Sequence, residues 1–291
     1  MRIGIVILPD ERWSIAGRRW QRAEEYGFDH AWTYDHIGWR DLVDGPWFDA
    51  VPTLTAAAMV TRRIGLGTYV ASPNFRHPVP FIRSVLALDD ISQGRLLLGV
   101  GAGGTGHDSS VLGAPELSPR ERVDRFGEFL ELTGRLLTSD HVSYQGDHYT
   151  AVDARTRPGA GRTPLLVAAS GPRTLRLAAK YGDGWVTYGD ASVEGTDAWW
   201  VALERQRNRF EAALAEAGRD PATVRRYLNL DSAPVSPMSS GDAFTDLTGR
   251  AAALGFTDVV AHWPRASGWY AGSEKTLETV AGLLPKLRRL T

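Results

Sequence analysis

The chain alternates short apolar runs with longer helical patterns over its whole length of 291 residues. Eight runs rich in β-branched or other apolar residues are predicted strands: Arg2–Leu8, His30–Tyr34, Ile64–Ala71, Arg95–Gly101, Pro164–Ala169, Gly184–Thr187, Tyr227–Asp231 and Thr257–His262. Such alternation is typical of parallel strands joined by right-handed crossovers. Eight repeats favour a closed (β/α)8 TIM barrel, an α/β fold, over an open sheet.

The segments between these strands carry apolar residues at helical spacing. In one of them, for example, Val123, Phe126 and Leu130 recur at intervals of three and four residues. The expected helices are Trp13–Tyr26, Pro80–Ile91, Arg120–Leu137, Trp199–Ala217, Gly241–Leu254 and Glu274–Leu290.

One segment departs from this alternation. Residues 141–152 (HVSYQGDHYTAV) alternate with period two around Gln145, Gly146 and Asp147, which predicts a small β-hairpin inserted before the fifth strand. No linker or low-complexity tract divides the chain. We therefore expect a single barrel domain over residues 1–291.

Composition removes several classes of function. The formal net charge is -1, which gives no indication of a nucleic-acid or membrane surface. The chain has no cysteine, which excludes disulfides, thiolate metal sites and a cysteine nucleophile. The apolar run Ile3–Leu8 is too short for the core of a signal peptide. We expect a cytoplasmic protein that acts on a small molecule.

In a TIM barrel the active site lies at the carboxyl ends of the strands. The acidic residues expected there, Asp10, Asp35, Asp108 and Asp231, are single, which disfavours the paired carboxylates of a glycosidase. No histidine spacing suits a metal site, so we predict none. The G-x-S-x-G motif of serine hydrolases is absent.

Residues 101–106 (GAGGTG) match G-x-G-x-x-G after the fourth expected strand. A Rossmann motif should open a helix, but residues 107–119 contain two prolines, Gly113 and adjacent serines. We interpret the segment as a passage where backbone approaches a flat ligand, the alternative being a tight loop without one.

Two further segments at strand ends are candidates. Ser170-Gly171-Pro172 follows the fifth expected strand and resembles a helix start, whose free N–H groups suit a phosphate. The alternative is an ordinary helix start. Asp35-His36 ends the second expected strand, where a functional pair and a structural hydrogen bond are equally compatible with the sequence.

The chain has ten tryptophans. Five are expected in loops: Trp13, Trp39, Trp47, Trp263 and Trp269. They indicate packing at the barrel rim, a wide aromatic pocket for a planar ligand, or both.

The motifs at the strand ends occur in a recognisable order. They are YDH at 34–36, IGLGTYVASP at 64–73, RHP at 76–78, GRLLLGVGAG at 94–103 and AASGP at 168–172. This series resembles the bacterial luciferase-like superfamily, and within it the deazaflavin-dependent branch. The resemblance extends from Met1 to about Gly189, and the remaining third matches only in pattern.

The resemblance implies an oxidoreductase whose deazaflavin coenzyme, F420, lies at the carboxyl face of the barrel. His36 would be the catalytic residue, beside the ring with Asp35. Tyr69 and Val70 would form a bulge under the ring, and there we predict a cis peptide bond. The implied cofactor-binding residues are Asp35, His36, Tyr69, Val70, Gly103, His107, Ser170 and Gly171.

One position departs from the family pattern. The sugar-phosphate dehydrogenases of the family carry a glutamate where this chain has Gly104, which argues against oxidation of glucose-6-phosphate. The alternative functions are an FMN-dependent monooxygenase using reduced flavin and O2, a binding barrel without catalysis, and a hydrolase without cofactor. The resemblance also implies a homodimer, packed through the small apolar residues of Val51–Met59.

Overall fold

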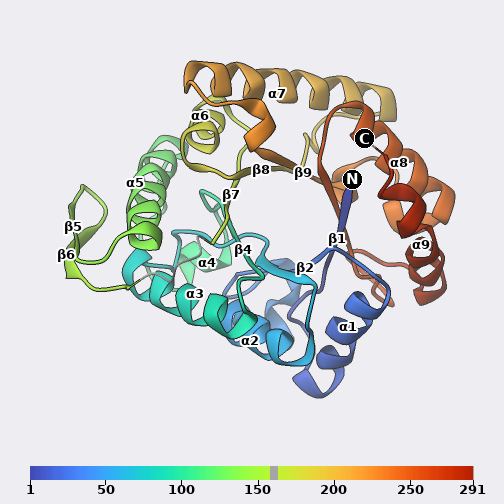
Figure 1. Ribbon diagram of the computed structural model, residues 1–291, viewed down its shortest axis with the longest axis horizontal. Coiled ribbons are helices and arrows are strands. Elements are labelled where there is room, and N and C mark those ends of the chain that lie inside the picture. Colours follow the sequence, from blue (N-terminus) through green and yellow to red (C-terminus); the bar gives the residue numbers. More distant parts are fainter. Residues whose placement is uncertain (158–162, 291) are drawn as a thin grey trace.

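The computed structural model describes residues 1–157 and 163–290. Parallel strands close into a barrel in the order β1-β10-β9-β8-β7-β4-β3-β2, ringed by helices (Figure 1). The barrel strands are β1 (Arg2–Val6), β2 (His30–Thr33), β3 (Gly65–Thr68), β4 (Leu96–Val100), β7 (Leu165–Ala168), β8 (Gly184–Thr187), β9 (Arg225–Asn229) and β10 (Asp258–His262). Each lies at a predicted position, so the predicted TIM barrel is confirmed.

The helices cover the outside of the barrel. They are α1 (Trp13–Glu25), α2 (Ala50–Val60), α3 (Pro78–Ser92), α4 (His107–Ser110), α5 (Pro119–Thr138), α6 (Pro172–Tyr181), α7 (Thr196–Glu216), α8 (Gly241–Ala253) and α9 (Glu274–Leu287). Neither α2 nor the short α4 was among the expected helices. Gly113 and the prolines of residues 107–119 follow α4, which ends after one turn. No helix among the described residues is long and apolar enough to cross a bilayer.

Two cores result from burial of both strand faces. The outer core lies between strands and helices and includes Ile3 and Ile5, whereas the inner core fills the barrel and combines aliphatic side chains with Trp32, Tyr69 and Tyr227. The Trp32 ring lies 5.5 Å from that of Tyr69 and 5.9 Å from that of Tyr227. A Cβ at Gly67 would lie 2.3 Å from the Trp32 ring, so glycine in β3 makes room for the indole.

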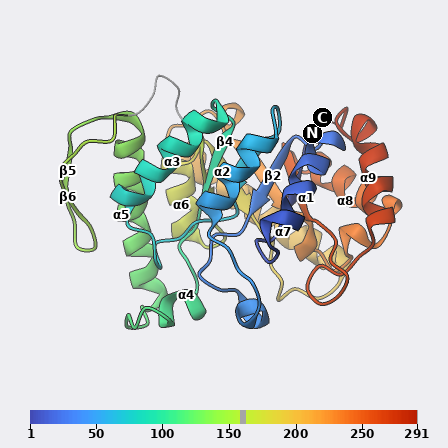
Figure 2. The same cartoon turned by 90° about the horizontal axis from the view of Figure 1, so that it is seen from below.

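The predicted hairpin is confirmed as β5 (Val142–Gln145) and β6 (Thr150–Ala154). It stands beside α5 and outside the barrel (Figure 2). Glu128 of α5 fixes it, because that carboxylate accepts the backbone N–H groups of Asp147, His148 and Tyr149 at 2.9, 2.9 and 3.1 Å. The hairpin therefore contributes nothing to the barrel ladder.

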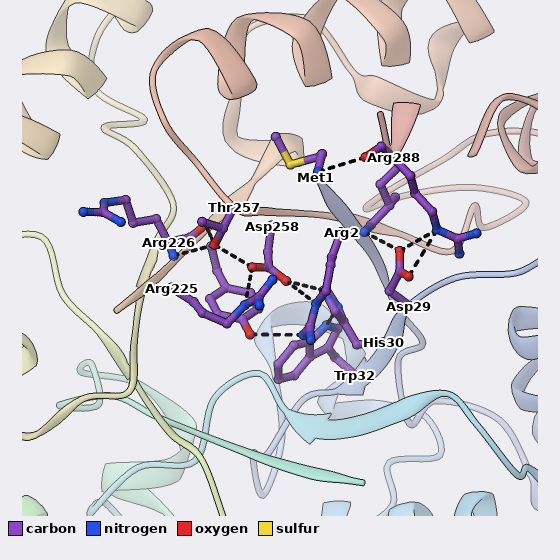
Figure 3. A network of polar contacts seen from close by, with 12 residues as sticks. Met1, Arg2, Asp29, His30, Trp32, Arg225, Arg226, Thr257, Asp258 and Arg288 are labelled. Carbon is purple, nitrogen blue, oxygen red and sulfur yellow. Dashed lines mark hydrogen bonds and ion pairs between the residues drawn. The ribbon is translucent and has the colours of Figure 1, made fainter. Parts of the chain in front are cut away.

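A polar network closes the amino end of the barrel (Figure 3). Its centre is Asp258, whose carboxylate accepts from His30 Nε2 at 3.0 Å and from the Nε atoms of Arg2 and Arg225 at 2.9 Å each. Asp258 and His30 are fully buried. The cationic and N–H partners lower the pKa of the Asp258 carboxyl against the opposing effect of burial. Residues at this end serve stability in TIM barrels.

His30 makes stability depend on pH. Burial lowers the pKa of His30 below its ordinary 6.5, and its Nδ1 already accepts from Trp32 Nε1 at 2.7 Å. Protonation therefore favours the unfolded chain, so this contribution is present above pH 6.5 and is lost as the pH falls below it. We expect the urea midpoint to fall between pH 7 and 5.5. The fall should be smaller in His30→Gln and unchanged in His148→Gln, on the exposed hairpin. Equal slopes in all three proteins would contradict this assignment.

The opposite end of the barrel carries α4 and the long loops after the strands, while both chain termini lie at the closed end (Figure 2). This open end is the carboxyl face, where the site was expected.

Candidate functional site

A pocket of about 570 Å³ opens at the carboxyl face. It lies between the loop after β2 and the loop after β4. Its lining residues are His36, Gly38, Trp39, Arg40, Val43, Asn74, Gly104, Thr105, Gly106, His107, Asp108 and Ser110. Of the predicted site residues, His36 and His107 line it directly.

His36, in the loop after β2, is held by the carboxylate of Asp108 in the loop after β4. Its Nδ1 lies 2.5 Å from Asp108 Oδ2, and Asp108 Oδ1 accepts the backbone N–H of Ile37 at 2.8 Å. Trp47 Nε1 donates to the carbonyl oxygen of His36 at 2.8 Å. Because a carboxylate only accepts, Nδ1 carries the hydrogen and Nε2 is left for a ligand. His36 is thereby a fixed, half-exposed imidazole at the pocket wall.

Asp35 does not pair with His36. It is buried and binds Arg76 through both carboxylate oxygens, at 2.6 and 3.1 Å. Arg76 also donates to Asp49 Oδ2 at 2.7 Å, and Asp49 caps α2. Burial raises the pKa of Asp35, and the Arg76 guanidinium opposes this. The pair links the end of β2 to the start of α2 rather than lining the pocket.

The predicted cis peptide bond is present between Tyr69 and Val70. Tyr69 is buried and Val70 is half-buried against β4, where a Cβ at Gly101 would lie 2.8 Å from Val70 Cγ2. The cis bond follows Thr68, the last residue of β3.

In the glycine-rich segment after β4, one glycine packs against a neighbouring loop and two others line the pocket. Gly103 has a φ of +73°, and a Cβ there would lie 2.6 Å from Asn74 Oδ1, so this residue packs against Asn74. Gly104 and Gly106 line the pocket, and a Cβ at either would meet nothing within 4 Å. The open backbone for a flat ligand is therefore one to three residues beyond the predicted Gly103.

Ser170 and Gly171 lie at the end of β7, with Gly171 as the N-cap of α6 and Pro172 in its first turn. Both are exposed, and neither belongs to the residues that line the pocket. The predicted helix start is confirmed.

The loop tryptophans divide between the pocket wall and the packing of the barrel. Trp39 lines the pocket, and the Trp269 ring packs against it at 5.8 Å, with the guanidinium of Arg40 3.8 Å from the Trp269 ring centroid. Trp263, in contrast, is buried in the outer core. Trp13 lines a separate apolar pocket of about 350 Å³ between α1 and α2.

Sequence reasoning missed the polar groups behind the pocket. His262 at the end of β10 binds Asp231 through Nδ1 and the hydroxyl of Tyr34 through Nε2, each at 2.8 Å. It had seen Asp231 only as a single acid at a strand end. The bond from Asp108 to His36 was likewise not predicted. The parallel order of the strands was the available signal, since it brings these ends together.

Comparison with known proteins agrees with this architecture. The family model described as luciferase-like monooxygenase matches residues 1–261. An F420-dependent glucose-6-phosphate dehydrogenase of Amycolatopsis mediterranei (strain U-32) is 34% identical over 72% of this chain and 63% of its own length. An F420-dependent hydroxymycolic acid dehydrogenase of Mycobacterium tuberculosis is 31% identical over 72% of this chain and 56% of its own. The match thus spans less than two thirds of either relative.

Solved structures share the fold. An F420-dependent secondary alcohol dehydrogenase, in complex with an F420-acetone adduct, superposes with a TM-score of 0.82 at 19% identity and covers 99% of both chains. A monooxygenase from Streptomyces bottropensis gives a TM-score of 0.79 at 21% identity, over 98% of this chain and 99% of its own. With the family model matching nearly nine tenths of its length, this chain belongs to the luciferase-like monooxygenase family.

Proposed function

We propose that this protein is an oxidoreductase that transfers a hydride between the deazaflavin coenzyme F420 and a small organic substrate. The observation that carries the proposal is His36, fixed by Asp108 at the wall of the pocket on the carboxyl face. Relatives that share this part of the chain are named F420-dependent dehydrogenases.

The pocket suits a flat ring. Its volume is about 570 Å³, its Gly104 and Gly106 backbone is open, and Trp39 offers an apolar wall. Such pockets, with a few fixed polar groups, are typical of cofactor sites. When bound, the coenzyme would supply the carbon that gives or receives the hydride. The protein has to orient the ring, exclude water and provide a proton route.

The residues at the strand ends take the following roles in this proposal. His36 directs Nε2 toward the reacting atoms, where the neutral ring accepts a proton and the imidazolium donates one. Tyr69 and Val70 support the ring from the end of β3. The helix start at Ser170 and Gly171 receives the coenzyme phosphate. His107 is the remaining proposed contact to the coenzyme, whereas Asp35 and Gly103 would act from behind the pocket wall, through Arg76 and Asn74.

Titration with the two candidate cofactors tests the proposal. We expect F420 to bind more tightly than FMN, followed by quenching of coenzyme fluorescence. Ser170→Asp places a negative charge at the helix start, so it should weaken F420 binding, whereas Ser143→Asp on the hairpin should not. Micromolar binding of FMN with none of F420 would instead establish the flavin-dependent monooxygenase.

We also propose a homodimer formed through α2 and its neighbours. Exposed apolar side chains gather on these helices: Ile15 of α1 is 57% exposed, Met59 of α2 is 66% exposed and Ile91 of α3 is 41% exposed. Light scattering should give twice the chain mass. Met59→Glu should yield monomers, and Val152→Glu, at an 83% exposed apolar position on the hairpin, should not. A monomeric wild-type protein at working concentration would contradict the proposal.

A further inference from the structure

Four polar side chains form a continuous hydrogen-bonded chain behind the pocket. Tyr270 OH lies 2.8 Å from Tyr34 OH, Tyr34 OH lies 2.8 Å from His262 Nε2, and His262 Nδ1 lies 2.8 Å from Asp231 Oδ2. The residues come from the ends of β2, β9 and β10 and from the loop before α9. The chain therefore crosses one side of the carboxyl face.

The donor and acceptor in each hydrogen bond follow from Asp231, at the inner end of the chain. Asp231 Oδ2 also accepts the backbone N–H of His262 at 2.8 Å, so this oxygen is held by two donors of one residue. An ionised carboxylate only accepts, which places the imidazole hydrogen on Nδ1. Nε2 is then an acceptor, so Tyr34 donates to it and accepts from Tyr270.

Burial increases from Tyr270 through Tyr34 to His262, and the Asp231 side chain is 8% exposed. Tyr270 is half-buried, Tyr34 is 5% exposed and the His262 side chain is 1% exposed. The rings of Tyr270 and His262 are stacked, with centroids 3.5 Å apart and planes 4° apart. The Tyr34 ring lies 5.8 Å from that of His36 and 5.2 Å from that of Trp39, both of which line the pocket. Tyr270 is thus the outer end, and the chain runs behind the pocket wall.

We propose that Tyr270, Tyr34, His262 and Asp231 form a proton relay between the carboxyl face and a buried imidazole. The use of this relay in catalysis rests on the proposed hydride transfer with F420. As an alcohol substrate is oxidised, its C–H electrons leave as hydride to the coenzyme and its O–H electrons form the carbonyl bond. The proton passes to Tyr270, the Tyr270 proton to Tyr34, and the Tyr34 proton to His262 Nε2. The imidazolium then faces the Asp231 carboxylate, and reduction of a carbonyl runs in reverse.

The two tyrosines suit this transfer. Burial raises the pKa of Tyr34 well above its ordinary value, and burial also raises the pKa of Tyr270. Both hydroxyls therefore keep their hydrogen at neutral pH and pass protons without a standing phenolate.

Hydroxyl exchange tests the relay without substrate or coenzyme. In full-length protein with ¹³C-labelled tyrosine, the exchange rate of the Tyr34 hydroxyl is read from the deuterium isotope shift on its ring Cζ. We expect Tyr270→Phe to slow this exchange at least tenfold, because the outer end is then broken. Asp231→Asn, which disturbs the inner end, should slow it as well.

A merely structural role gives the opposite result. If Tyr270 only covers His262, loss of its hydroxyl should leave exchange at Tyr34 unchanged or faster, and that outcome would overturn the relay. Trp269→Phe is the matched control, because Trp269 precedes Tyr270 in the same loop. The substitution removes the hydrogen bond from Trp269 Nε1 to Asp41 but keeps the Tyr270 hydroxyl. Its exchange rate should stay at the wild-type value. Amide exchange in β2 and β10 shows whether each variant is folded. F420 binding is measured separately, so its failure leaves the exchange result intact.

Discussion

Replacing His36 with alanine is expected to lower the rate of hydride transfer by about 10²–10⁴, the usual contribution of a positioned proton donor. The ring is fixed through Nδ1 by Asp108, and Nε2 faces the pocket. Alanine removes both the donor and the orientation, while the strands below keep their contacts. The measurement is single-turnover reoxidation of reduced F420 by one acceptor, followed by absorbance, with circular dichroism as the test of folding.

His36→Gln separates two roles of the same side chain. Glutamine retains an N–H donor but does not transfer a proton at neutral pH. A rate near that of alanine indicates proton transfer, whereas a rate near that of wild type indicates a hydrogen bond to the ring or substrate. Unchanged turnover in both variants would reduce His36 to a structural residue.

Asp258→Ala is expected to give the largest loss of stability, about 3–5 kcal/mol in the free energy of unfolding. The carboxylate is fully buried and accepts from His30, Arg2 and Arg225. Its removal leaves the buried His30 N–H without an acceptor and leaves two guanidinium groups without their counter-charge. Urea unfolding of the intact protein gives the value.

A matched exposed pair provides the control. Asp153 binds His141 and Arg155 but is 48% exposed, so Asp153→Ala should lose less than about 1 kcal/mol. Similar losses in the two variants would show that the barrel-end network adds no more than a surface ion pair. Because Asp258 lies at the closed end, its variant should still bind F420 under conditions where it is folded.

The barrel was predictable because its evidence is local and repeated. Six of the eight predicted strands are followed by an expected helix, and eight such units close in only a few ways. The expected helices did not include α2 and α6, although the start of α6 was predicted at Ser170-Gly171-Pro172. The hairpin was equally readable, since its period-two pattern surrounds Gly146. Helix bounds were less certain: α7 begins at Thr196, three residues before the predicted start at Trp199, because the exposed first turn carries little apolar signal.

The sequence predicted where the site lies but not which side chains bind one another there. The carboxyl ends of the strands located His36 and His107 correctly at the pocket. The partners, however, are 41 residues apart for Asp35 and Arg76 and 72 apart for His36 and Asp108. No local pattern encodes such a contact, since it depends on the lengths and turns of the intervening loops. Gly103 illustrates this, because it packs against Asn74 of another loop while Gly104 and Gly106 line the pocket.

The hairpin that Glu128 holds against α5 is a position where residues can be inserted without changing the barrel. It shares no backbone hydrogen bond with the barrel strands, so residues added at its tip alter neither the shear nor the closure of the barrel. Its turn at Asp147 is exposed, and the hairpin stands outside the barrel (Figure 2). Grafted tags, reporters or whole domains belong at this turn, where lengthening a loop carries only a small entropic cost.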